Sequence, residues 1–328
     1  MARLSKVLFL TDEREDYLAD GLLHGLRQIS AINTVDFPRK ESLYALDNLA
    51  KTNLRGGGFT LYGLLDEKLR IDRNFIQQKL EDKWFDLIVI SNIWRQWGLM
   101  TQWENLLKNQ RALAILDGDD DDRFYPSSGT RIRHFGPTRW LRNLISHPNT
   151  IYFKREWTRR TYRWPYNCKL KPIAFSIPNE KIIESPTTKK LFFPSHIVDR
   201  EVAKFVNAQT NYAFTTEIEY RQNLADSRFG ITTKRGGWEC LRHYEIAASG
   251  TIPCFKNLAS KPTSCAPHGL VDGVNCISYN TTQDLMEQIN KISQPAELAM
   301  RRAALEWAKK SSTKLRAIEL LQAMKIDP

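Results

Sequence analysis

Residues 227–255 read SRFGITTKRGGWECLRHYEIAASGTIPCF, and the order of elements that they predict indicates an α/β fold. A short apolar run at 228–232 predicts a strand, a Lys-Arg-Gly-Gly turn follows it, and the next residues predict a helix. After Gly250, a second apolar run at 251–255 predicts another strand. A strand, a glycine turn, a helix and a strand in this order form the βαβ unit of a parallel α/β sheet.

The turn in this unit is a candidate anion-binding site. Gly236 and Gly237 permit a ligand to approach the backbone closely, and Lys234 and Arg235 add positive charge beside them. The free N–H groups at the start of the following helix also attract anions. A glycine pair by itself is a weak signal, because strand, glycine turn and helix recur throughout α/β folds.

The predicted helix adds a donor and an acceptor on one face. Arg242 and Glu245 are three residues apart, so both side chains lie on the same side of the helix. A guanidinium fork beside a carboxylate suits a diphosphate next to a ribose diol. A solvent-exposed ion pair between the two side chains is the alternative interpretation.

Taken together, the stretch resembles the C-terminal half of GT-B glycosyltransferases, most closely the exostosin-like and spore-protein-like enzymes. In these enzymes a strand, an Arg-Gly turn, an R-x-x-E helix and an A-x-G-x-I-P exit follow one another. The matching elements here are 227–232, Arg235 with Gly236, Arg242 with Glu245, and 248–253. The segment LVDGVNCISY, 270–279, is similar to the loop and strand that come next in the family. The resemblance covers residues 190–325 well and the first half loosely.

The resemblance implies two Rossmann-like, doubly wound α/β domains that face a cleft. It implies transfer of a sugar from a nucleotide diphosphate donor, a UDP- or GDP-sugar, to a hydroxyl, with no cofactor and no metal. Glu245 would then bind the ribose, while Arg235 and Arg242 face the diphosphate. Many GT-B enzymes carry another Glu eight positions before the ribose Glu, but Gly237 stands there and Glu239 is the nearest carboxylate. This departure leaves the stereochemical outcome open.

An acidic segment, AILDGDDDDRFYP at 114–126, follows the apolar run 112–116. Carboxylates that follow a parallel strand stand where open α/β sheets bind ligands, so Asp117 and Asp119 are candidate catalytic residues. Three interpretations remain open. The D-x-D pattern suits a divalent metal, an Asp facing the cleft suits a general base on the acceptor hydroxyl, and an acidic loop suits charge balance.

The first half alternates predicted strands and helices, which favours a parallel, doubly wound sheet. Strands are predicted at 6–10, 34–37, 85–91, 112–116 and 151–156, with a helix at 16–29. The glycine cluster at 55–59 suits a close approach to a ligand, but a mobile loop or a helix start is the favoured interpretation. Tryptophans 94, 97 and 103 either stack on a sugar or pack in the core, and packing is the favoured interpretation.

Domain boundaries follow from the proline-rich segment that begins at residue 172. We predict an acceptor-side domain at 1–175, a linker at 176–187 and a donor-binding domain at 188–328 that ends in helices at 295–310 and 313–326. A strand at 189–195 would lead to His196, and Arg200 would begin the next helix. Both residues are candidate donor contacts, with plain surface placement as the alternative.

Composition and charge set further limits. A chain of 328 residues accommodates two domains, and its apolar runs are far shorter than the roughly 18 residues of a membrane span. Five cysteines without C-x-x-C spacing read as reduced thiols, which predicts a cytoplasmic protein with peripheral membrane association as an option.

The net charge of +11 concentrates between Arg123 and Lys171, where twelve Lys or Arg stand against one acid. This basic span, with its interleaved aromatics, suits an anionic glycan, a lipid-linked acceptor or nucleic acid. Packing at a domain interface is the competing interpretation. A nucleic-acid-binding protein and a catalytically silent sugar- or nucleotide-binding protein are the alternatives to an enzyme.

Overall fold

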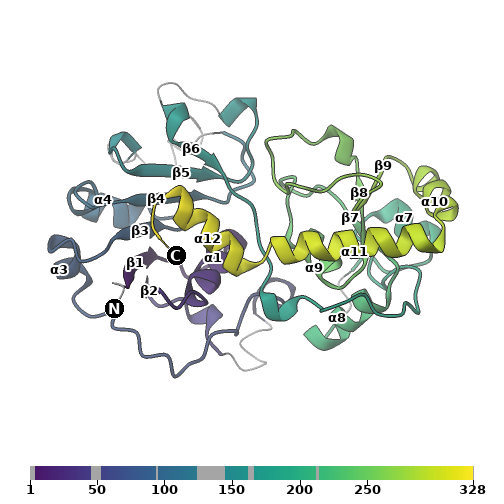
Figure 1. Ribbon diagram of the computed structural model, residues 1–328, viewed down its shortest axis with the longest axis horizontal. Helices are drawn as coiled ribbons and strands as arrows, with labels where there is room; N and C mark the ends of the chain where they lie inside the picture. Colours follow the sequence, from purple (N-terminus) through teal and green to yellow (C-terminus); the bar gives the residue numbers. More distant parts are fainter. Residues whose placement is uncertain are drawn as a thin grey trace.

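Two parallel β-sheets organise the chain, as seen in a computed structural model that describes residues 4–45, 53–93, 95–123, 145–161, 166–211 and 214–327 (Figure 1). The first sheet has the strand order β2-β1-β3-β4-β5-β6, and the second has the order β7-β8-β9. All pairings between these strands are parallel. The strands are β1 (Ser5–Leu10), β2 (Ile32–Phe37), β3 (Leu87–Ile90), β4 (Leu113–Asp117), β5 (Thr150–Lys154), β6 (Leu170–Pro172), β7 (Phe229–Thr232), β8 (Ile252–Lys256) and β9 (Ile277–Tyr279).

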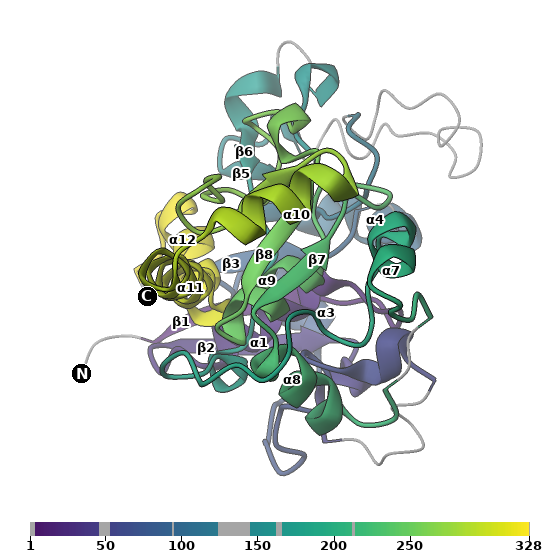
Figure 2. The same cartoon turned by 90° about the vertical axis from the view of Figure 1, so that its right-hand side faces the viewer.

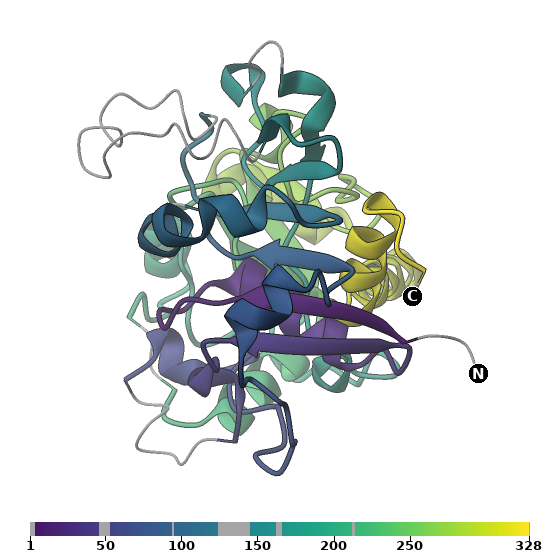
Figure 3. The same ribbon diagram turned by 90° about the vertical axis from the view of Figure 1, so that its left-hand side faces the viewer.

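Helices flank both sheets, and Figures 2 and 3 show each half of the molecule from its own end. The helices are α1 (Tyr17–Arg27), α3 (Ile76–Glu81), α4 (Trp97–Leu107), α7 (Arg200–Phe205), α8 (Glu217–Asp226), α9 (Leu241–Ala248), α10 (Thr282–Lys291), α11 (Gln294–Lys310) and α12 (Thr313–Ala323). Within the described ranges, none of these helices has the length and apolar character that a membrane span requires.

The first sheet is buried on both faces, as the apolar runs predict. Along β1, Val7 and Phe9 join one core cluster, while Leu8 and Leu10 join another on the opposite face. This alternation follows from the two-residue repeat of a strand, and burial of each such side chain contributes about 1.5–3 kcal/mol. The predicted parallel α/β sheet is therefore confirmed.

The strand order of the first sheet creates a crevice. The chain passes from β1 to β2 on one side and then crosses to β3 on the other side of β1. At such a switch point the connections that follow the two strands diverge, and open α/β sheets bind their ligands there. The segments after β1 and β3 therefore border a natural binding site.

The C-terminal helices connect the two halves. Helix α11 packs against α9, and α12 returns to pack against α1 (Figure 1). The approach of α1 and α12 is so close that a Cβ atom on Gly25 would lie 1.9 Å from the Thr313 carbonyl oxygen. The segment that connects the sheets is bound to both helices, because Ile177 exchanges backbone hydrogen bonds with Ser311 and Thr313 at 3.1 and 2.9 Å. The exact domain boundaries stay a prediction.

One predicted strand does not form. Residues 189–195 run beside β7, where Leu191 and Phe192 accept backbone hydrogen bonds from Arg228 and Phe229 at 3.0 and 3.1 Å. Their regular pairing is confined to the single bridge between Leu191 and Ser227. Pro194 has no N–H to donate, which is typical of a segment at the edge of a sheet.

Candidate functional site

Two adjoining cavities lie between the halves, at the carboxyl ends of the strands. The first, here called the β1 cavity, has a volume of about 450 Å³ and is lined by residues that follow β1, β3 and β4. The second, here called the α9 cavity, has a volume of about 570 Å³ and is lined by residues around the start of α9. Tyr17, Arg55, Arg235 and Cys240 line both cavities. The two cavities therefore form one continuous cleft.

The start of α9 faces the α9 cavity. The helix begins at Leu241 after Cys240, and no side chain caps its first turn. Cys240, Leu241 and Arg242 all line the cavity. Uncapped N–H groups at a helix N-terminus carry a partial positive charge and bind anions, so this end of the cavity favours a negatively charged group.

Positive side chains dominate the same cavity. Its lining includes the arginines Arg55, Arg200, Arg235 and Arg242 and a single carboxylate, Glu245. In the described part of the chain, no hydrogen bond or ion pair involves the guanidinium groups of Arg55, Arg200 or Arg235. Several unpaired guanidinium groups around one cavity repel one another and attract an anion of high charge.

Glu245 lies at the wall of the α9 cavity and is 8% exposed. Its two carboxylate oxygens accept hydrogen bonds from the Thr60 and Tyr220 hydroxyls, each at 2.6 Å. Thr60 belongs to the first half of the chain and also donates its backbone N–H to Glu217 at 3.1 Å. The carboxylate is thus held in a fixed orientation by groups from both halves.

His196 orients Arg242 in the α9 cavity. The Nδ1 atom of His196 accepts a hydrogen bond from Arg242 at 3.2 Å, and Nε2 donates to the Thr210 carbonyl oxygen at 3.1 Å. Burial and the neighbouring Arg242 lower the pKa of His196 to about 4. The imidazole is therefore neutral at pH 7, which fixes the tautomer that Arg242 requires.

The predicted glycine turn packs against the first half of the chain. Neither glycine nor Lys234 is among the residues that line the two cavities. A Cβ atom on Gly236 would lie 2.1 Å from an Asp120 oxygen, and one on Gly237 would lie 2.3 Å from a Glu156 oxygen. These glycines bring the turn against carboxylates of the first half. A donor contact at this turn stays a prediction. Lys234 lies over the Trp238 ring, 4.8 Å from its centroid.

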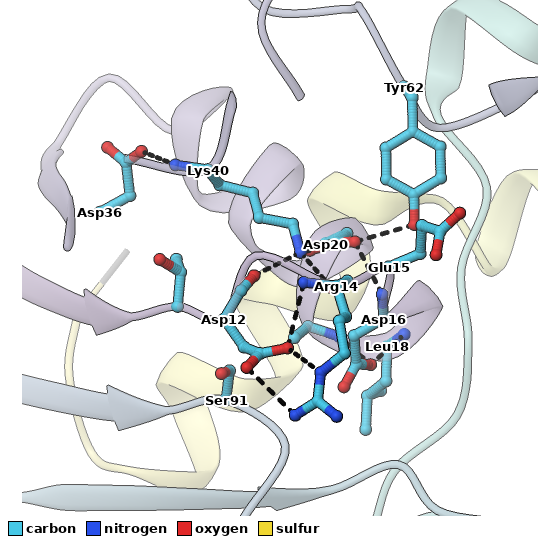
Figure 4. Close-up of polar contacts among 12 residues, drawn as sticks. Asp12, Arg14, Glu15, Asp16, Leu18, Asp20, Asp36, Lys40, Tyr62 and Ser91 are labelled. Atoms are coloured by element: carbon cyan, nitrogen blue, oxygen red, sulfur yellow. Dashed lines mark hydrogen bonds and ion pairs between the residues drawn. The ribbon is translucent and has the colours of Figure 1, made fainter. Parts of the chain in front are cut away.

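The loop after β1 supplies the acidic wall of the β1 cavity (Figure 4). Asp16 caps α1 by accepting hydrogen bonds from two backbone N–H groups of the first turn. The buried Asp20 carboxylate holds this loop in place. It accepts hydrogen bonds from the Asp16 N–H and the Tyr62 hydroxyl, both at 2.9 Å, and it lies 3.2 Å from the Lys40 ammonium group. Burial raises the pKa of Asp20 to about 6. Glu15 and Asp16 are thereby held at the cavity.

The two predicted catalytic aspartates lie in different environments. Asp117 is fully buried, 3.0 Å from the equally buried Lys154 ammonium group, and it accepts a hydrogen bond from the Tyr152 hydroxyl. This placement does not favour Asp117 as a base, because it lines neither cavity and its charge is paired with Lys154. Asp119 lines the β1 cavity, where it accepts the Asp121 N–H at 3.3 Å. Asp119 stays a candidate.

A buried arginine forms the floor between the two halves. Arg155 is ion-paired with Glu156 at 2.7 Å and with Asp120, and it donates to the Glu239 carbonyl oxygen at 3.1 Å. Its guanidinium carbon also lies 4.7 Å from the Phe175 ring centroid. Despite burial, the carboxylates around it raise the pKa of Arg155. This network fixes the acidic loop after β4 against the segment that leads into α9.

Other predicted features are located as follows. In the described ranges, no group of three or more His, Cys, Asp or Glu is arranged to hold a metal ion. Five of the twelve basic residues of the span lie outside the described residues, which omit 124–144 and 162–165. Of the others, Lys154 and Arg155 are buried and paired, whereas Arg159, Arg160 and Lys171 are exposed. Trp94 is also outside them, while Trp103 stacks on Phe37 with 5.9 Å between ring centroids, as core packing predicts.

Sequence reasoning gave little weight to several residues of the cleft. Arg55 stood in a glycine cluster for which a mobile loop or a helix start was the favoured interpretation, and Glu15, Asp16 and Arg95 were not singled out. A signal for these three was available. They follow the first and third strands, and the rule that selected Asp119 applies equally to those strand ends.

Comparisons with known proteins show the fold. No family model and no curated protein matches the chain. Among solved structures, the Anabaena protein HepE in complex with UDP and glucose is 12% identical with a TM-score of 0.53, covering 98% of this chain and 99% of its own. A glycosyltransferase from Rickettsia africae is 9% identical with a TM-score of 0.54 and coverages of 99% and 98%. The N-terminal domain of Candida albicans trehalose-6-phosphate phosphatase is 10% identical with a TM-score of 0.54 and coverages of 99% and 97%. The chain therefore has the GT-B fold, with two Rossmann-like α/β halves that face a cleft.

Proposed function

We propose that this protein is a glycosyltransferase that moves a sugar from a nucleoside diphosphate donor to a hydroxyl group of an acceptor, without a metal ion. The α9 cavity carries this proposal, because four arginines, an uncapped helix N-terminus and a buried carboxylate line one space. The HepE structure, which contains UDP and glucose in the same fold, supports it. The finer exostosin-like or spore-protein-like type belongs to the proposal and rests on residues 227–253.

The donor side of the proposal uses the groups around α9. Glu245 accepts hydrogen bonds from the ribose hydroxyls, and Arg235 and Arg242 bind the diphosphate of a UDP- or GDP-sugar. His196 keeps Arg242 in position, and Arg200 adds charge at the same cavity. As the bond between the sugar and the phosphate oxygen breaks, negative charge grows on the leaving diphosphate. Preorganised arginines and helix N–H groups stabilise that charge.

The acceptor side of the proposal uses the β1 cavity. Asp119 accepts the proton of the attacking acceptor hydroxyl, which makes the oxygen a better nucleophile. Residues 1–175 present the acceptor and residues 188–328 hold the donor. Small movements about the segment 176–187 bring the halves together and exclude water, which protects the donor from hydrolysis.

Two alternatives receive less support. A nucleic-acid partner was suggested by the basic span, of which Lys154 and Arg155 are in buried ion pairs while Arg159, Arg160 and Lys171 are exposed. A silent sugar- or nucleotide-binding protein would have the same donor cavity. Donor turnover separates this second alternative from an enzyme, since transferases slowly hydrolyse their donors when no acceptor is present.

The test is release of nucleoside diphosphate from a panel of UDP- and GDP-sugars in the presence of EDTA. We expect one class of donor to be hydrolysed, and Arg242→Ala to lower its kcat/KM by about 10- to 100-fold, as loss of a charge-assisted hydrogen bond predicts. Arg302→Ala, which removes the same charge from the exposed side of α11, is the control and should leave turnover unchanged. Turnover that disappears in EDTA would overturn the metal-independent mechanism, and binding without any turnover would favour the silent binder.

A further inference from the structure

The short turn η2 (Arg55–Gly58) brings an arginine of the first half to the donor side of the cleft. We propose that Arg55 completes the diphosphate site from the opposite wall, so that the donor site is shared between the two halves of the chain. This inference rests on the proposed function and extends it to a residue outside the predicted donor domain. In this proposal Arg55 recognises the diphosphate of the donor and contacts neither the base nor the ribose.

The position of Arg55 is the first observation. Arg55 and Arg235 come from opposite halves, and both line the β1 cavity and the α9 cavity. The point where the cavities join is where a sugar would leave its diphosphate and meet the acceptor. A cation at this junction contacts the leaving group without occupying either the nucleoside end or the acceptor end.

The backbone that presents Arg55 is built for this position. Its N–H donates to a Glu15 carboxylate oxygen at 2.6 Å, which fixes the turn to the loop after β1. Gly56 and Gly57 have φ values of 60° and 67°, a backbone conformation that residues other than glycine rarely adopt. A Cβ atom on Gly56 would meet nothing within 4 Å, so the turn is open on its cavity side.

The residues just after the turn are attached to the second half of the chain. Phe59 stacks on Tyr220 with 6.0 Å between ring centroids. Thr60 donates its hydroxyl to Glu245 at 2.6 Å. The segment that carries Arg55 is therefore packed against the donor wall itself, and the Glu245 carboxylate that would bind the ribose is already joined to it.

The charges of Arg55 and Arg235 favour an anion at the junction of the two cavities. In the described part of the chain, no carboxylate or other acceptor pairs with the guanidinium groups of Arg55 and Arg235. Two such cations at the junction of two cavities repel each other, and an anion between them removes the repulsion. A diphosphate has two charged groups and several oxygens, so it can accept from arginines on both walls at once.

The experiment compares the affinities of UDP, UMP and uridine for the wild-type protein, Arg55→Ala, Arg55→Lys and Arg14→Ala by calorimetry in EDTA. Arg14→Ala is a matched control, since Arg14 lies in the neighbouring loop, is ion-paired with Asp12 and lines neither cavity. We expect Arg55→Ala to weaken UDP by about 10- to 100-fold, UMP by less and uridine by less than about twofold. Arg55→Lys should recover part of the loss, and Arg14→Ala should change none of the three affinities.

Two results would overturn the inference. Equal losses for UDP, UMP and uridine in Arg55→Ala would show that the residue only supports the turn. Unchanged UDP affinity in Arg55→Ala would show that Arg55 does not contact the diphosphate. If instead the wild-type protein binds none of the three ligands, the proposed function itself fails, so the two failures are distinguishable.

Discussion

Replacing Arg155 by Met tests whether the buried network beneath the cleft joins the two halves. The Arg155 side chain is 1% exposed and contacts the carboxylates of Asp120 and Glu156, the carbonyl oxygens of Gly118 and Glu239, and the Phe175 ring. Methionine retains much of the volume and the ring contact but removes the charge and every hydrogen bond. The main loss therefore falls on the buried carboxylate that Arg155 neutralises.

The magnitude follows from what remains around Glu156. Without Arg155, this 2% exposed carboxylate keeps the Glu239 N–H at 3.2 Å as a hydrogen-bond donor, and its charge is no longer paired. Breaking a buried ion pair from one side costs about 3–5 kcal/mol, and we expect this decrease in the free energy of unfolding for Arg155→Met. The double variant with Glu156→Gln removes the stranded charge, so its cost should be less than the sum of the single costs by about 0.5–3 kcal/mol.

The assay is urea unfolding of wild type, both single variants and the double variant, followed by circular dichroism and by tryptophan fluorescence. A cost below about 1 kcal/mol for Arg155→Met, or strict additivity in the double variant, would show that Arg155 and Glu156 are not a coupled buried ion pair. In either case the ion pairs would not hold the acidic loop to the segment before α9.

Three further predictions use the same cleft. Gly237→Ala places a Cβ atom 2.3 Å from a buried Glu156 oxygen and should lower the free energy of unfolding in urea by about 1–3 kcal/mol. The control Gly98→Ala in α4, with no atom within 4 Å of the added Cβ, should raise it by about 0.5–1 kcal/mol. Similar values for both variants would contradict the close approach at Gly237. The pKa of His196 in the folded protein, about 4, lies below the ordinary 6.5, so the contribution of His196 to stability is present above pH 6.5 and is lost as pH falls toward 4. In thermal unfolding, His196→Gln should therefore lose less stability than wild type between pH 6.5 and 4. Equal losses would contradict the lowered pKa of His196. Asp119→Asn should lower turnover by about 10²- to 10⁴-fold with UDP affinity unchanged. Asp117→Asn leaves Lys154 buried without its anion and should lower the free energy of unfolding by about 3–5 kcal/mol. The reverse pattern would make Asp117 the catalytic residue.

Local patterns were sufficient to predict most of the fold. The apolar runs at 6–10, 112–116 and 228–232 form β1, β4 and β7. A strand buried on both faces has a continuous run of apolar side chains, which is visible in the sequence. The segment 189–195 has a similar apolar character, but it lies at an edge and includes Pro194, so it pairs with β7 only in part. Pairing of this kind depends on neighbours that are distant in the sequence.

The candidate site was predictable where it depends on one helix. Arg242 and Glu245 line the α9 cavity because helical periodicity places them on one face. Gly236 and Gly237 were assigned to a ligand, but the atoms nearest to a Cβ at either position belong to Asp120 and Glu156 from another part of the chain. A glycine in a sequence indicates a close approach without indicating what approaches.

Long-range packing decided the remaining residues. Asp117 and Asp119 are two positions apart and identical in type, yet one is buried against Lys154 and the other lines the β1 cavity. Arg55 is 180 residues from Arg235 in the sequence and lines the same two cavities. The residue types were visible in the sequence, but the partners that select among them are contributed by the opposite half.

Calorimetric titration of UDP and GDP in EDTA, with wild type and Glu245→Gln, tests whether the α9 cavity binds a nucleoside diphosphate without a metal ion. Glu245→Gln keeps the shape of the side chain, and its contacts to Thr60 and Tyr220 can be checked by urea unfolding. We expect one nucleotide to bind the wild-type protein at one site per chain without a metal ion, and Glu245→Gln to weaken this binding by about 10-fold or more while Arg14→Ala does not. Binding that requires a divalent metal, equal affinity for wild type and Glu245→Gln, or no binding of either nucleotide would contradict this expectation.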